Sequence, residues 1–235
     1  MKKDTILRDY YNTVAYSKDH LNLLNQKRKR SRELLETFAK EGLTPFIYGS
    51  VARGDVHRDS DIDIIFLQLI PPYQIEIILE KYGINNYFRE IIMATPTDTL
   101  KLYIYLNELE SITIPLSKFD KKSEEFYDFG GKVNLNQLED NLRVPGIDKR
   151  LVLIKPTLEG HEEYSIIGNE HLAAKQVNVS IDLINERKRV LLKREKHGRT
   201  GVFLKRLLDL NESTEVVLKK LANKKSFVRK KLFQK

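Results

Sequence analysis

One stretch, Phe46 to Phe66 (FIYGSVARGDVHRDSDIDIIF), constrains this chain more than any other. It begins with a short apolar run that predicts a strand, and Gly49-Ser50 then predicts a turn into a helix. A polar loop leads to a second predicted strand, which carries Asp61 and Asp63. Because side chains alternate between the two faces of a strand, both carboxylates lie on one face and the adjacent isoleucines point into a core.

These residues suit a phosphate and its metal ion. Two carboxylates at the start of a strand offer hard oxygen ligands, and Mg²⁺ usually binds through one or two carboxylates together with substrate phosphates. Gly49 lets the backbone approach a phosphate closely, and Ser50 adds a hydroxyl beside the donors of a helix start. The stretch therefore predicts a site for a nucleoside triphosphate and a divalent cation.

The order Gly49-Ser50, ten intervening residues and Asp61-Ile-Asp63-Ile resembles the signature of DNA polymerase beta-type nucleotidyltransferases. Arg53, Gly54 and Ser60 also fit the GSxxRG and SDxD patterns of that superfamily. Over most of the chain, the resemblance is to archaeal two-domain nucleotidyltransferase-like proteins, through the segments GSVARGDVHRDSDIDI, FREIIMATP, RVPGIDKRL and GRTGVF. It implies an α/β (α+β) architecture, in which a nucleotidyltransferase fold with a mixed sheet and flanking helices precedes a winged helix-turn-helix-like domain.

The resemblance also implies a reaction, in which a nucleotide moves from an NTP to a hydroxyl acceptor and pyrophosphate leaves. In that family pattern Asp61 and Asp63, with a third acid, hold two Mg²⁺ ions, which Mn²⁺ can replace. Gly49, Ser50 and Arg53 are then expected to contact the phosphates, where developing charge needs donors.

Glu90 is the candidate for the third acid, which would bind metal and accept the proton of the attacking hydroxyl. It lies in a predicted strand at 87–93 between apolar neighbours, where a carboxylate without a partner costs free energy. Glu108 and Glu110 are alternatives for the same role. A salt bridge from Glu90 to Arg89 or to another basic residue is an equally good explanation of its position.

Further patterns outline two domains. Residues 4–41 are expected to be mostly helical, and 100–106 with 111–116 predict a β-hairpin. The basic run 27–30 is interpreted as a solvated helix face, with a nucleic-acid contact as the alternative. Gly130-Gly131 is the expected division between a nucleotidyltransferase domain at 1–130 and a basic domain at 131–235.

In the second domain, helices at 170–176 and 180–195, a basic turn at 197–201 and a strand from Val202 predict a winged helix-turn-helix. Two helices joined by a turn also occur in ordinary helical packing. Six residues are the candidates for binding nucleic acid: Arg187, Lys188, Lys193, Arg194, Lys196 and Arg199.

Charge favours nucleic acid as a partner. Residues 185–235 hold 17 lysines and arginines against 5 aspartates and glutamates, a net charge of +12, whereas the whole chain carries +8. A positive field concentrated on one module attracts polyanions and makes their binding depend on salt.

Composition excludes several classes of site. The chain has no cysteine, so disulfides and thiolate zinc sites are excluded. It has no run of eighteen apolar residues, and the polar start Met1-Lys2-Lys3-Asp4 is unlike a signal peptide, so a cytoplasmic protein without membrane contact is expected.

Three functions are compatible with these residues. The first is an Mg²⁺-dependent nucleotidyltransferase with RNA or DNA as the expected acceptor. The alternative is a nucleic-acid-binding regulator whose catalytically weak nucleotidyltransferase domain senses nucleotide. A third is a small enzyme that transfers AMP to a protein or a small molecule.

Overall fold

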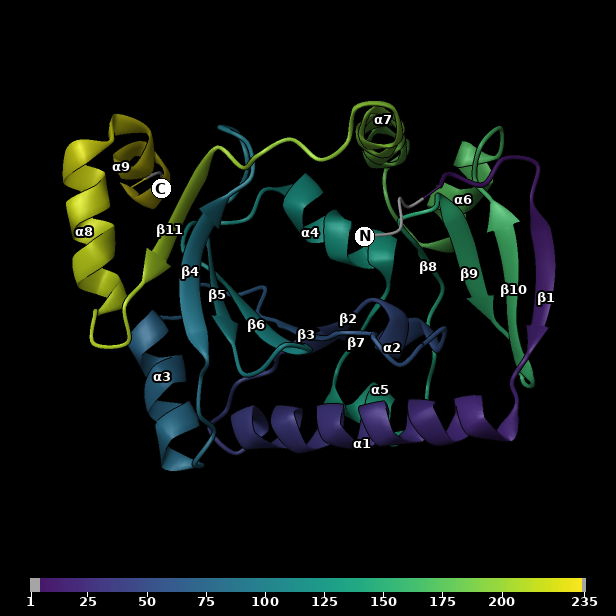
Figure 1. Cartoon of the computed structure of the whole chain (residues 1–235), viewed down its shortest axis with the longest axis horizontal. Helices are drawn as coiled ribbons and strands as arrows, with labels where there is room; N and C mark the ends of the chain where they lie inside the picture. Colours follow the sequence, from purple (N-terminus) through teal and green to yellow (C-terminus); the bar gives the residue numbers. More distant parts are fainter. Residues whose placement is uncertain (1–4, 234–235) are drawn as a thin grey trace. The chain divides into compact units, whose positions relative to one another are not determined.

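The computed structural model describes residues 5–233, and the chain divides into two compact units. Unit 1 consists of Met1–Arg32, Ile47–Ser60 and Glu124–Thr200, and unit 2 consists of Glu33–Phe46, Asp61–Ser123 and Gly201–Lys235 (Figure 1). Each unit draws on both halves of the sequence, whereas the sequence pattern places a division at Gly130-Gly131; that division stays a prediction. The expected lack of a signal peptide rests on residues 1–4, which lie outside the described residues.

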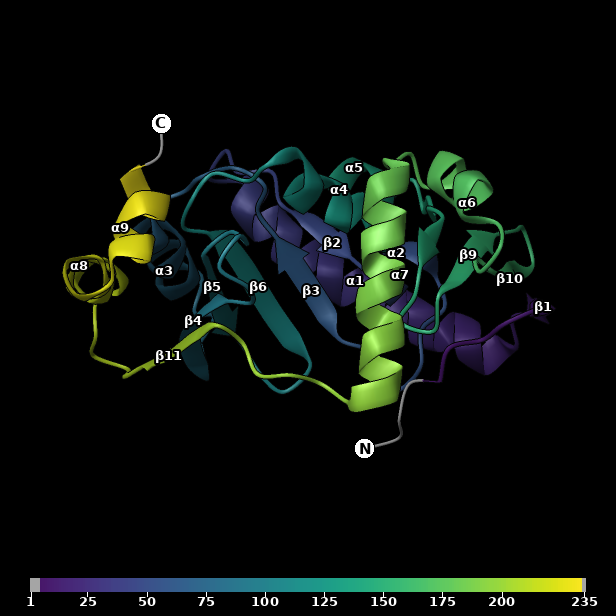
Figure 2. The same cartoon turned by 90° about the horizontal axis from the view of Figure 1, so that it is seen from above.

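Unit 2 contains a mixed sheet, as predicted. Its strands are β3 (Ile62–Ile65), β4 (Phe88–Met93), β5 (Lys101–Tyr105), β6 (Glu110–Pro115) and β11 (Leu204–Leu208). They lie side by side in the order β11-β4-β5-β6-β3 (Figure 2). The β3–β6 pair is parallel, and the other three pairs are antiparallel. The β5–β6 pair confirms the predicted hairpin.

This sheet has two chemically different faces. One face is apolar, and Ile64, Leu102, Ile91 and Ile112 on it are fully buried. Helices α3 (Pro72–Lys81) and α8 (Thr214–Lys224) pack on this face through Arg89, and α9 (Ser226–Phe233) packs against α8. The opposite face carries polar and aromatic side chains, which alternate with the apolar ones along each strand.

Arg89 connects the apolar face to both helices. Its guanidinium donates to Glu76 of α3 at 2.5 Å and to Thr214 of α8 at 3.3 Å, and the side chain is only 5% exposed. It also donates to three carbonyl oxygens in the segment between β11 and α8, those of Asp209, Leu210 and Glu212. One buried cation therefore donates to acceptors on both helices and in the segment between β11 and α8.

Unit 1 has its own antiparallel sheet, with strand order β1-β10-β9-β8. Its strands are β1 (Tyr11–Ala15), β8 (Gly146–Ile147), β9 (Val152–Pro156) and β10 (Gly160–Ser165). Helices α6 (Glu170–Gln176) and α7 (Ile181–His197) share a buried cluster with Leu151 and Leu153. The unit also includes the β2 (Phe46–Tyr48) and β7 (Lys132–Val133) pair, α2 (Ser50–Arg53) and α5 (Leu135–Glu139). Helices α1 (Lys18–Ala39) and α4 (Lys121–Gly130) contribute residues to both units.

The prediction that residues 4–41 are mostly helical is wrong for the first part of that range, because 11–15 form β1. Aromatic and β-branched side chains favour this conformation. Tyr11 lies opposite Tyr164 of β10, and their ring centroids are 5.1 Å apart. Residues 11–15 thus pair with a strand that is distant in the sequence, whereas the residues that carry the helical pattern form α1.

The winged helix is not confirmed. Its two helices are present as α6 and α7, and Ser180 caps α7 by accepting a hydrogen bond from the Leu183 amide. The strand after the basic turn begins at Leu204, however, and pairs with β4. The strand expected to form a wing is thus part of the mixed sheet.

None of the helices within residues 5–233 combines the length and the apolar character that crossing a membrane requires.

We expect Arg89→Met to lower the free energy of unfolding by about 2–4 kcal/mol, because Glu76 and three carbonyl oxygens lose their buried donor. The measurement is urea unfolding followed by circular dichroism. The matched control is Arg229→Met on α9, where the side chain is exposed. Equal stabilities of the two variants would contradict this role of Arg89.

Candidate functional site

The Gly49 turn joins β2 to α2 in unit 1. Gly49 has φ 86° and ψ −143°, a backbone conformation that residues with a Cβ avoid. Its amide donates to the Gly131 carbonyl at 2.9 Å. A Cβ at this position would meet no atom within 4 Å, so the space in front of the glycine is open. Gly49 and the half-buried Ser50 thus offer an accessible backbone turn, as a phosphate-binding segment requires.

Arg53 was predicted to contact phosphates, but its side chain makes hydrogen bonds within the protein. Its side chain is buried, with Nε and Nη2 each 2.9 Å from the carboxylate of Asp55 and Nη1 2.6 Å from the Gly130 carbonyl. Burial is the largest single influence and would lower the pKa of Arg53, but Asp55, together with Asp148 and Tyr48, more than offsets it, so the pKa is raised and the guanidinium stays charged. A Cβ on Gly146 would come within 2.5 Å of the Gly130 carbonyl oxygen and 2.8 Å of Cδ of Arg53, so glycine makes room for both.

Asp61 and Asp63 lie at the start of β3 in unit 2. Asp61 is exposed and Asp63 is half-buried, whereas the intervening Ile62 is buried. This confirms the alternation expected from the sequence. Asp63 pairs in register with Ser111 of the parallel strand β6, and the Ser111 hydroxyl donates to Oδ1 of Asp63 at 2.7 Å.

Glu90 is not brought to Asp63 by this fold. Two strands, β5 and β6, lie between β4 and β3, so at about 4.8 Å per strand interval the two residues are about 14 Å apart across the sheet. Instead, Glu90 accepts from the Tyr105 hydroxyl at 2.9 Å and pairs with Lys205 at 2.7 Å. The alternative explanation, a salt bridge to a basic residue, describes the observed contact, and the basic residue is Lys205.

The alternative acids do not join Asp63 either. Glu110 lies opposite Ile62 in the register, so it faces the other side of the sheet, and Glu108 lies in the loop before β6. The neighbours that β6 places on the face of Asp63 are Ser111 and Thr113. In the described part of the chain, no group of three or more histidines and acids is placed to hold a metal ion. The carboxylate pair therefore has a hydroxyl beside it where a third acid was expected.

Four residues on neighbouring strands lie opposite one another in the register and form a row across the polar face of the sheet. In order they are Asp63, Ser111, Tyr105 and Phe88. Tyr105 and Phe88 stack, with ring centroids 4.2 Å apart and planes at 18°. Burial, with the hydrogen bond to Glu90 as the second cause, strongly raises the pKa of Tyr105, so its hydroxyl remains a donor. Sequence inspection missed this row because the four residues come from four separate strands.

The six basic candidates on and after α7 divide into two groups. Lys188 pairs with Glu170 at 2.5 Å, and the guanidinium of Arg187 lies 4.8 Å from the ring centroid of Phe126. Both side chains are half-buried. The other four are exposed: Lys193, Arg194, Lys196 and Arg199. The C-terminal part of α7, from Lys193, and the residues after it are thus the exposed part of the predicted basic surface.

Within the basic run 27–30, the expectation of a solvated face is wrong for Arg28. This side chain is 3% exposed, and Nη2 donates to the Leu142 carbonyl at 2.6 Å. Burial lowers the pKa of Arg28 to about 10. Arg28 is therefore part of the interior of unit 1 and is not a nucleic-acid contact.

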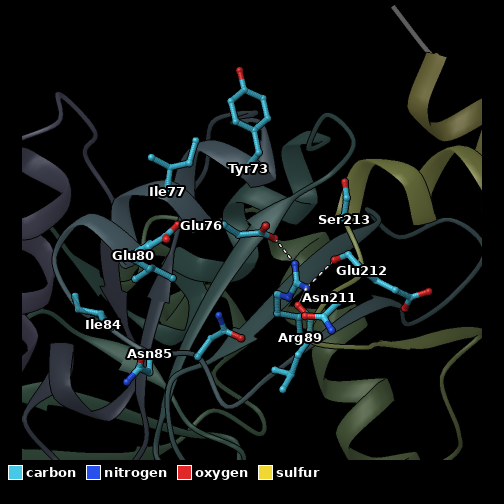
Figure 3. A pocket seen from close by; sticks show the side chains of 13 residues that line it. Tyr73, Glu76, Ile77, Glu80, Ile84, Asn85, Arg89, Asn211, Glu212 and Ser213 are labelled. Atoms are coloured by element: carbon cyan, nitrogen blue, oxygen red, sulfur yellow. Dashed lines mark hydrogen bonds and ion pairs between the residues drawn. The ribbon is translucent and has the colours of Figure 1, made fainter.

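A separate cavity of about 530 Å³ lies on the apolar side of the unit 2 sheet, between α3 and the segment before α8 (Figure 3). Glu76, Arg89 and Glu212 meet at one side of it and are joined by hydrogen bonds. Because Arg89 and Glu90 are successive strand residues, this cavity and the face of Glu90 and Asp63 are on opposite sides of the sheet. The sequence contains no motif that predicts this cavity. Its lining residues come from two distant segments, 73–89 and 210–213, which the pairing of β11 with β4 brings together.

The central part of the chain matches a known protein family. The family model described as nucleotidyltransferase domain matches residues 28–196, which is more than half of the chain. The chain belongs to the nucleotidyltransferase domain family. Searches of curated proteins and of solved structures gave no match. The region shared with the family includes Gly49, Ser50, Asp61 and Asp63, and it ends before β11. Membership supports a transferase that uses a nucleoside triphosphate.

We expect Arg53→Lys to lower the free energy of unfolding by about 2–3 kcal/mol, because one ammonium cannot replace a guanidinium that binds a carboxylate in two places and a carbonyl in a third. Urea unfolding measures this loss. Arg58→Lys is the control, since Arg58 is exposed in the loop of the same motif. Unchanged stability of Arg53→Lys would show that the hydrogen bonds of the buried guanidinium do not contribute to stability.

Proposed function

We propose that this nucleotidyltransferase-family chain moves a nucleotide from an NTP to a hydroxyl group and releases pyrophosphate. The observation that carries the proposal is the pair Asp61 and Asp63, which lie on one face at the start of a strand and follow a glycine-serine turn at the family's spacing. Gly49 and Ser50 bind phosphate oxygens in this proposal. Arg53 keeps the turn in shape from within unit 1, since its donors are used by Asp55 and Gly130.

The donor set at Asp61 and Asp63 fits Mg²⁺ or Mn²⁺ that takes its remaining ligands from water and phosphate oxygens. When bound, two such ions would neutralise phosphate charge and orient the attacking and leaving oxygens. The Ser111 hydroxyl holds Oδ1 of Asp63 in a fixed orientation, which is the usual task of a group next to a metal ligand.

Nucleic acid is the proposed acceptor. Its support is the local charge: Lys193, Arg194, Lys196 and Arg199 are exposed near the end of α7, within a segment whose net charge is +12. Exposed lysines and arginines bind phosphates without reading sequence, and such binding weakens as salt rises. A cytoplasmic location is proposed with this acceptor.

The test is transfer of label from each of the four α-labelled NTPs, with Mg²⁺ or Mn²⁺, to RNA, to duplex DNA or to no added acceptor. We expect one acceptor to gain label and Asp63→Asn to reduce transfer by at least about 100-fold, because a ligand of the phosphate-bound ion is lost. Asp59→Asn, in the exposed part of the same loop, is the control and should keep its activity. Full activity of Asp63→Asn would exclude this site.

A second function, a nucleic-acid-binding regulator that senses nucleotide, is favoured by one observation: Ser111 stands beside Asp63 where a third acid was expected. A regulator should bind NTP and change its affinity for nucleic acid without releasing pyrophosphate. Pyrophosphate release in the presence of the acceptor distinguishes the enzyme from the regulator.

Ser111→Asp places a third carboxylate beside the pair. We expect Mn²⁺ to bind at least about tenfold more tightly, because a unit charge about 4 Å away is worth a few kcal/mol at an effective dielectric constant near 20. Calorimetric titration with Mn²⁺ measures the change, and Ser111→Asn is the uncharged control of the same shape. Equal affinities of the two folded variants would mean that Asp61 and Asp63 are not the metal site.

A further inference from the structure

The polar face of the unit 2 sheet carries a stack of aromatic rings. Phe88 of β4 and Tyr105 of β5 lie opposite one another in the register, with nearly parallel rings whose centroids are 4.2 Å apart. Tyr103, two residues before Tyr105, has its ring plane at 21° to that of Tyr105, with centroids 6.4 Å apart. The three rings therefore form one series of nearly parallel planes on β4 and β5.

These rings are not part of the closed core. Phe88 and Tyr105 are half-buried, whereas the apolar residues on the other face, such as Ile91 and Ile104, are fully buried. Aromatic rings that are partly open to solvent and gathered on one surface commonly mark a binding site.

Polar contacts hold the stack in place. The Tyr105 hydroxyl donates to Glu90, and Glu90 pairs with Lys205 of β11, 2.7 Å away. The side chain of Glu90 is 4% exposed, so this acceptor is shielded from water and the bond restricts the tilt of the Tyr105 ring. A ring fixed in this way loses little freedom when a ligand packs on it.

The stack lies in line with the carboxylates. From Asp63 the row passes through Ser111 to Tyr105, two strand intervals or about 10 Å away, and reaches Phe88 after a third interval, at about 14 Å. A ligand with phosphates at Asp63 and a flat ring one sugar further along this row would place that ring at Tyr105 and Phe88. A nucleoside triphosphate has this layout.

We propose that Phe88 and Tyr105 form a stacking site for the base of the NTP whose phosphates bind at Asp61 and Asp63. The inference rests on the proposed function and adds the position of the base. The occupant is the NTP because the stack continues the row that starts at the carboxylates and because the family uses this substrate. Every base has a π-face, so stacking on these rings tolerates all four bases.

The absence of tryptophan from the chain provides a direct reporter. In Phe88→Trp the only indole lies in the stack, and its fluorescence should fall on addition of Mg²⁺ with ATP, CTP, GTP or UTP. Inorganic tripolyphosphate, which has no base, should leave it unchanged. The matched control is Tyr73→Trp, since Tyr73 is 53% exposed on α3, which packs on the opposite face of the sheet.

A second variant does not depend on the indole. Phe88→Leu keeps an apolar side chain and removes the ring, so NTP should bind about tenfold more weakly in equilibrium dialysis, while tripolyphosphate affinity is unchanged. Tyr73→Leu should bind NTP as the parent does. A general loss of structure would weaken the binding of both NTP and tripolyphosphate, whereas loss of stacking would weaken the binding of NTP alone.

The outcomes separate the two proposals. If the parent and Phe88→Leu bind NTP equally, the stacking site is wrong and the proposed function stands. If single-stranded oligonucleotide quenches the Phe88→Trp indole and NTP does not, the rings hold the nucleic acid and the NTP assignment is wrong. If the parent retains no NTP in dialysis, the proposed function fails together with the stacking site.

Discussion

The parallel pairing of β3 with β6 is the constraint on which the candidate site depends. The Ile62 amide donates to the Leu109 carbonyl at 2.7 Å, and the Phe66 amide donates to the Thr113 carbonyl at 3.0 Å. These bonds set a register in which Asp63 lies opposite Ser111. A shift of one residue would turn both aspartates toward the apolar core. The geometry of the carboxylates is therefore a property of backbone pairing, and Ser111 is their neighbour for the same reason.

Successive residues of β4 show how one strand serves two purposes. Arg89 faces the helices and anchors α3 and the segment before α8, whereas Glu90 faces the polar side and holds Tyr105 and Lys205. Each charge is buried, and each is compensated by a partner of opposite sign. The sheet thus carries buried apolar residues on one face and polar and aromatic side chains on the other, because strand alternation separates the two environments.

Charge alone is a poor guide to the binding surface of this chain. Arg28, Arg53 and Arg89 are all buried, and their guanidinium groups donate to backbone carbonyls of residues distant in sequence. Guanidinium suits this task because it presents five donors in a fixed plane. The cations at the end of α7 are exposed, so the proposed nucleic-acid contact rests on them and not on the total charge.

The sequence by itself determined the family motif, the strand that carries Asp61 and Asp63, the β5–β6 hairpin and the helices α6 and α7, because each depends on local pattern and short-range pairing. Tertiary structure decided the rest. It formed β1 against β10, paired β11 with β4 where a wing was expected, and kept Glu90 three strand intervals from Asp63. Strand order and register join residues far apart in the chain, and no local pattern records which strands will be neighbours.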